Sequence, residues 1–131
     1  MELVAGVDEV GRGPLAGPVI ACALILPTEH SIKGLKDSKK LSKKKREELF
    51  PIIKDQAISI GLGISNVKTI DKYNIREATF MAMKSALRKL DPKPVKALID
   101  GESLKDISIP NKGIVRGDNL IDSIKAASII A

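Results

Sequence analysis

One amphipathic segment restricts most strongly what this chain can fold into. Between Thr69 and Pro92 the apolar residues recur at spacings of three and four, which predicts a helix that ends before Pro92 and Pro94. The apolar residues are Ile75, Ala78, Ala82, Met83, Ala86, Leu87 and Leu90. A helix with one apolar face needs another element to cover that face, so the rest of the chain has to supply one.

Short apolar runs rich in Val, Ile and Leu can supply that element as strands of a sheet. We expect strands at residues 3–7, 18–26, 57–64, 95–99 and 113–115. Strands that alternate with helices predict an α/β fold. A length of 131 residues predicts one domain, residues 1–131.

A second helix is expected between the second and third strands. Ser42 can cap its first turn, and the helix should run to about Asp55. Its apolar contacts are predicted to be Leu49, Ile52 and Ile53.

The content of cysteine and histidine excludes several kinds of site. Cys22 and His30 are the single residues of their types, so the chain can build no disulfide framework, zinc site or histidine-based catalytic centre. Cys22 lies in an apolar run and is expected to be a small buried side chain. No apolar run approaches the roughly 20 residues of a membrane helix, and we expect a cytoplasmic protein. Any chemistry must use carboxylates, hydroxyls or lysines.

The charge of the chain suggests a polyanionic partner. The formal net charge is +6 and the sequence pI is about 9.5. Only 2% of the residues are aromatic, so bases have few rings on which to stack. If the partner is a nucleic acid, its backbone is the expected point of contact.

Acidic residues follow the predicted strands at the points where α/β proteins usually build their sites. Asp8 and Glu9 end the first strand, Asp100 ends the fourth, and Asp118 precedes the last helix. Converging carboxylates repel one another unless a hard cation such as Mg²⁺ or Mn²⁺ neutralises them. The alternatives are that Asp100 is a turn residue before Gly101 and that Asp118 caps the helix.

Four sequence blocks, in order along nearly the whole chain, resemble the ribonuclease HII family. The first is Asp-Glu-Val-Gly-Arg-Gly-Pro-Leu-Ala-Gly-Pro-Val at residues 8–19, a long and specific motif. The others are residues 37–47, 98–101 and 117–131. The first block favours type II over type III, and its residues 14–19 are closer to the bacterial than to the archaeal form.

The resemblance implies a ribonuclease H-like fold with a mixed five-stranded sheet flanked by helices. It also implies that Asp8, Glu9, Asp100 and Asp118 are catalytic carboxylates that bind two Mg²⁺ or Mn²⁺ ions. The implied activity is cleavage of RNA in RNA/DNA hybrids and at ribonucleotides embedded in duplex DNA, leaving 3′-hydroxyl and 5′-phosphate ends. The implied mechanism is in-line hydrolysis without a covalent enzyme intermediate. The implied roles are ribonucleotide removal in DNA repair and RNA primer removal in DNA replication, performed by a monomer.

The resemblance also assigns a substrate-binding role to the loop Gly11-Arg12-Gly13. Glycines lack a Cβ, so the backbone can approach a sugar closely, and the 2′-hydroxyl is the group that distinguishes RNA from DNA. From composition alone the same loop could be only a tight connection between two strands.

A basic run is the second predicted contact with the substrate. Lys39, Lys40 and Arg46 are the residues to which we assign this role. Such a run is ordinarily a solvated face. Here residues 43–45 would place cations in the first turn of a helix, where the macrodipole disfavours them, and a bound phosphate would offset that cost.

The end of the sequence departs from the family pattern. The last helix, expected from Asn119 onward, ends on Ser-Ile-Ile-Ala with no terminating residue, so we expect that a C-terminal helical portion is missing. The family's substrate-stacking tyrosine has no counterpart, because Tyr73 lies elsewhere and is expected to be a packing residue.

Two other functions remain possible at this stage. One is a phosphotransferase of the actin and sugar-kinase type, which would need glycine-rich phosphate loops that are not evident after Asp100. The other is a catalytically inactive nucleic-acid-binding fragment.

Overall fold

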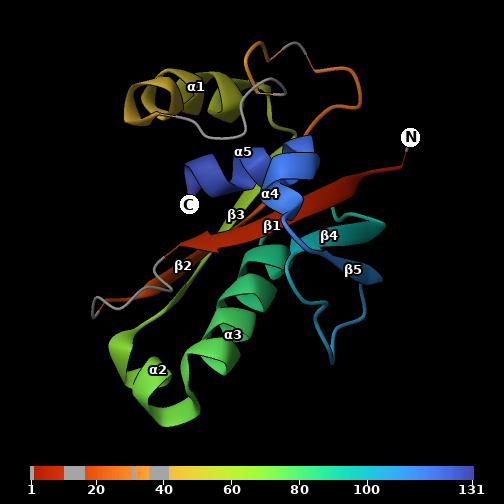
Figure 1. The fold of residues 1–131 in the computed structure, drawn as a ribbon. Helices are drawn as coiled ribbons and strands as arrows, with labels where there is room; N and C mark the ends of the chain where they lie inside the picture. The colour runs from red at the N-terminus through yellow and green to blue at the C-terminus, as the bar shows by residue number, and fades with distance from the viewer. Residues whose placement is uncertain (1, 11–16, 31, 36–41) are drawn as a thin grey trace.

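The computed structural model describes residues 2–10, 17–30, 32–35 and 42–131, and within them the chain forms a five-stranded mixed sheet (Figure 1). The strands lie in the order β3-β2-β1-β4-β5. β1 pairs antiparallel with β2 and parallel with β4, which confirms the predicted mixed sheet. The strands are β1 (Val4–Val10), β2 (Val19–Ile25), β3 (Ser59–Ser65), β4 (Lys96–Asp100) and β5 (Asn111–Ile114).

β1 is longer than the sequence predicted. The apolar run ends at Val7, but Asp8, Glu9 and Val10 continue the strand because β2 pairs with all three. Two acidic residues therefore belong to the sheet and do not lie in the loop after it.

The first face of the sheet is covered by α3 (Ile75–Arg88), as Figure 1 shows. The predicted apolar face is confirmed: Ala78, Ala82, Met83, Ala86 and Leu87 are buried. The prediction that this helix starts at Thr69 is wrong, because the segment folds as two helices, with α2 (Val67–Tyr73) preceding α3.

Asn74 causes the break between α2 and α3. It has φ 79°, a left-handed value that asparagine tolerates better than most residues, and its side chain accepts a hydrogen bond from the Glu77 N–H. Tyr73, expected to be a packing residue, is 45% exposed and its ring lies beside the Lys72 ammonium.

The second face of the sheet carries α1 (Lys43–Gln56), α4 (Gly117–Leu120) and α5 (Asp122–Ile130) (Figure 1). Ser42 caps α1 as predicted, since its side chain accepts a hydrogen bond from the Lys45 N–H at 3.1 Å. Leu49 and Ile53 are buried, whereas the prediction for Ile52 is wrong because its side chain is exposed.

The final helix also differs from the prediction. The helix expected from Asn119 is divided at Ile121, whose extended backbone separates α4 from α5. α5 crosses β1 at Gly6, where an added Cβ would lie 2.4 Å from the Ile124 backbone nitrogen. This close approach seats α5 directly over the strand that carries Asp8 and Glu9, while α4 contacts β4.

Among the described residues, no helix is long and apolar enough to span a bilayer.

Candidate metal centre

Three acidic residues meet at one edge of the sheet. Because β1 and β4 are adjacent and parallel, their carboxyl ends lie side by side, and those ends hold Asp8, Glu9 and Asp100. A carboxylate oxygen from each residue lies within 4.8 Å of the other two. Glu9 takes part although it adjoins Asp8 in the strand and successive side chains of a regular strand point to opposite faces.

The acid cluster is electrostatically unfavourable as it stands. Asp8 is only 4% exposed, and burial together with the charge of Asp100 raises the pKa of Asp8 to about 9. The Glu9 N–H donates a hydrogen bond to Asp8 Oδ1 at 2.8 Å, which partly opposes that shift. A site built from oxygen donors that cannot all carry charge in isolation suits a hard divalent cation such as Mg²⁺ or Mn²⁺.

Asp118 approaches the cluster through its backbone. Its N–H donates to Asp100 Oδ1 at 3.2 Å, but its carboxylate is not among the three that lie within 4.8 Å. Gly117 permits this approach, because a Cβ there would lie 3.4 Å from Asp100 Oδ1 and 2.7 Å from the Ile124 side chain. Asp118 is not the helix cap either, since Arg116 with φ 56° occupies that position of α4.

The sequence model of the ribonuclease HII family matches residues 5–131. This chain belongs to the ribonuclease HII family. Family membership places it among the ribonuclease H enzymes, and the blocks that first suggested the family lie within the matched segment.

Solved structures agree with this assignment. Ribonuclease H2 of Pyrococcus horikoshii OT3 matches with a TM-score of 0.80 and 30% identity, over 98% of this chain and 70% of that one. Ribonuclease HII of Archaeoglobus fulgidus, solved in complex with PCNA, matches with a TM-score of 0.74 and 25% identity over the same shares. Bst-RNase HIII in complex with Mn²⁺ shares the fold, with a TM-score of 0.74 and 22% identity, and this chain spans 50% of its length.

The residues predicted to bind substrate are only partly described in this ribonuclease HII chain. Gly11, Arg12, Gly13, Lys39 and Lys40 lie outside the described residues.

Arg46, the remaining predicted substrate contact, is exposed on α1. It lines a pocket of about 380 Å³ together with Lys43, Phe50 and Val10. Glu47 also lines the pocket, and because Val10 directly follows Glu9 the pocket adjoins the strand end that holds the acids.

Sequence reasoning missed the structural partners of Cys22 and His30. Cys22 is buried as expected, but it also pairs with Asp8 across the sheet, and burial with the charge of Asp8 raises the pKa of its thiol to about 12. The thiol is therefore protonated and unreactive at neutral pH. His30 lies 2.9 Å from Asp122 at the start of α5, a contact that no local spacing could reveal because 92 residues separate the two.

Proposed function

We propose that this chain is a metal-dependent endoribonuclease that hydrolyses the RNA strand of RNA/DNA hybrids and cuts at ribonucleotides embedded in duplex DNA. The observation that carries the proposal is the convergence of the Asp8, Glu9 and Asp100 carboxylates, within 4.8 Å of one another, in a member of the ribonuclease HII family.

The proposed ligands are Asp8, Glu9, Asp100 and Asp118, which would hold Mg²⁺ or Mn²⁺. Oxygen donors alone favour these hard cations over zinc. Asp118 belongs to the proposed set because its backbone N–H donates to Asp100 Oδ1, which keeps this residue next to the three converging acids. When bound, two such ions supply activation of a water molecule and stabilisation of the charge on the leaving oxygen of a phosphodiester.

The protein's own part would be to hold the four carboxylates where they can bind the cation. Asp8, with its pKa of about 9, would lose its proton when the cation binds, before hydrolysis. The proposed products are a 3′-hydroxyl and a 5′-phosphate, formed by in-line hydrolysis without a covalent intermediate on the protein.

The proposed substrate contacts are made mainly to the nucleic-acid backbone. Lys39, Lys40 and Arg46 would bind phosphates, and the loop Gly11-Arg12-Gly13 would contact the 2′-hydroxyl. The position of Arg46 in a pocket beside Val10, and the net charge of +6, support a path from α1 to the acids. We further propose that the protein acts as a monomer in the cytoplasm, in ribonucleotide removal and RNA primer removal.

The test is cleavage of two labelled duplexes, an RNA/DNA hybrid and a DNA duplex with one ribonucleotide, with and without Mg²⁺ or Mn²⁺. We expect metal-dependent cuts with the stated ends, and loss of cleavage by at least about 10³-fold in Asp8→Asn with duplex binding retained. Asp55→Asn, which alters an exposed acid at the far end of α1, is the matched control and should cleave normally.

Three outcomes would overturn the proposal in different ways. Binding without cleavage under any metal condition would indicate a nucleic-acid-binding fragment. Transfer of phosphate from ATP without cleavage would indicate a phosphotransferase. Normal cleavage by Asp8→Asn would contradict the assignment of Asp8 as a metal ligand.

A further inference from the structure

The turn that follows Asp100 is held on two sides. Gly101, with φ 98°, donates its N–H to the Ile114 carbonyl of β5 at 2.9 Å. The turn packs so closely on β5 that a Cβ at Gly113 would lie 2.4 Å from the Gly101 oxygen and 2.5 Å from the Ser103 nitrogen. β5 therefore supports one side of the turn, and the other side depends on Glu102.

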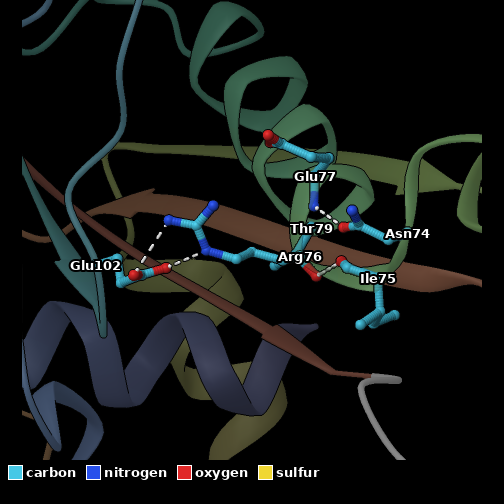
Figure 2. Close-up of polar contacts among 6 residues, drawn as sticks. All are labelled: Asn74, Ile75, Arg76, Glu77, Thr79 and Glu102. Atoms are coloured by element: carbon cyan, nitrogen blue, oxygen red, sulfur yellow. Dashed lines mark hydrogen bonds and ion pairs between the residues drawn. The ribbon is translucent and has the colours of Figure 1, made fainter.

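Glu102 forms a bidentate ion pair with Arg76 in the first turn of α3 (Figure 2). The Arg76 Nε–H and Nη2–H donate to the two carboxylate oxygens of Glu102 at 3.0 and 3.2 Å. The Arg76 guanidinium also lies 4.8 Å from the centre of the Phe80 ring, one helical turn further on. Two parallel hydrogen bonds and one ring contact give the arginine a defined direction.

The first turn of α3 is a firm support for that arginine. The Asn74 side chain accepts a hydrogen bond from the Glu77 N–H at 3.0 Å, and the Thr79 hydroxyl donates to the Ile75 carbonyl at 2.7 Å (Figure 2). Ser65, at the end of β3, donates its buried hydroxyl to the Ala78 carbonyl at 2.6 Å, which ties this end of α3 to the sheet.

We propose that Arg76 is a positioning residue for the metal centre: through Glu102 it holds the turn after Asp100 against α3, so that the Asp100 carboxylate stays beside Asp8 and Glu9. This role rests on the proposed function, because it concerns the geometry of the proposed metal ligands. Arg76 acts through Glu102, which lies in a turn that begins one residue after Asp100.

The solvent exposure of the Arg76–Glu102 pair allows a positioning role to be distinguished from a contribution to global stability. The Arg76 and Glu102 side chains are 53% and 59% exposed, and an exposed ion pair contributes little to global stability. Loss of the ion pair should therefore change the local geometry of Asp100 but leave the melting temperature almost unchanged.

The experiment compares Arg76→Leu and Glu102→Gln with the unaltered protein in two measurements. The first is the dissociation constant for Mn²⁺ by calorimetry, which should rise about 3- to 10-fold, less than for partners that contact a ligand directly. The second is amide hydrogen exchange without metal, where the Gly101 and Asp118 N–H groups should exchange at least about 3-fold faster. The melting temperature should change by less than about 2 °C.

Two further variants sharpen the test. The charge exchange Arg76→Glu with Glu102→Arg should restore Mn²⁺ affinity and amide protection to within about 2-fold of the unaltered protein. Arg88→Leu, which removes an exposed arginine at the opposite end of α3, should change neither.

Unchanged Mn²⁺ affinity and unchanged amide exchange in both single variants would overturn the inference and leave the proposed function intact. If the unaltered protein bound no Mn²⁺ and cleaved nothing, the proposed function would fail. The exchange rates of the two amides would still decide whether Arg76 holds the turn.

Discussion

The two faces of the sheet differ in the side chains that they bury. The face under α3 is a continuous apolar core, in which side chains of β1, β2 and β4 meet Ala82, Met83 and Leu87. The face under α4 and α5 has its own apolar cluster around Cys22 and Leu24, but it also carries the nearly buried Asp8. Both faces bury apolar side chains that stabilise the fold, and the second face also keeps a carboxylate out of water at a cost in stability.

The largest change in stability is expected for a substitution in the apolar core under α3. Leu87→Ala removes a side chain that is 2% exposed, and the free energy of unfolding should fall by about 2–5 kcal/mol because a cavity remains. Urea denaturation measures this change. Met81→Ala, on the same helix but 43% exposed, should change stability by less than about 0.5 kcal/mol, and an equal loss in both variants would contradict the assignment of the core face.

Substitution of Asp8 is expected to increase the stability of the metal-free protein, in contrast to substitution of Leu87. Its pKa is about 9 in the folded protein and about 3.8 in the unfolded chain, so the folded state holds the proton more tightly and metal-free stability declines as the pH rises from about 4 to 9. Asp8→Asn removes this penalty and should stabilise the metal-free protein by about 1–3 kcal/mol at pH 8. Urea denaturation at pH 4 and pH 8 should show the gain only at the higher pH; a loss of stability at pH 8 would contradict it.

Added metal should make the unaltered protein more stable than Asp8→Asn. Since the cation displaces the proton on Asp8, Mn²⁺ affinity should increase by up to about 10-fold per pH unit below pH 9. Calorimetry in buffers of different ionisation enthalpy counts the proton released. Mn²⁺ at about 100 times its dissociation constant should stabilise the unaltered protein by about 2.7 kcal/mol and leave Asp8→Asn much less affected. Equal stabilisation of both proteins would place the ion elsewhere.

The smallest expected effect concerns the basic surface beside the acid-bearing face. Arg46→Ala should weaken duplex binding by about 3- to 10-fold and reduce the slope of log affinity against log salt by about one, because one phosphate contact is lost. Lys54→Ala, at the other end of α1, is the control of equal charge change. Fluorescence anisotropy across a salt series measures both variants, and identical slopes would remove Arg46 from the binding surface.

Local patterns were sufficient for most of the elements, and they were wrong where packing overrode them. The apolar spacing from Ile75 to Leu90 identified α3, but the same spacing could not reveal the break at Asn74, where one left-handed residue turns the chain between two helices. The polarity of Asp8 and Glu9 suggested that the first strand had ended. Hydrogen bonding to β2, which no local window contains, extends the strand through both residues.

By itself the sequence determined the α/β fold, the family and the four candidate acids, because helix periodicity, strand runs and the block at residues 8–19 are each properties of short stretches. Only the tertiary structure decided which acids meet. Asp8 and Asp100 are 92 residues apart, and they become neighbours because β4 pairs parallel to β1. The raised pKa of Asp8 and the Arg76–Glu102 pair arise in the same way, since burial and charge contacts depend on distances that folding alone creates.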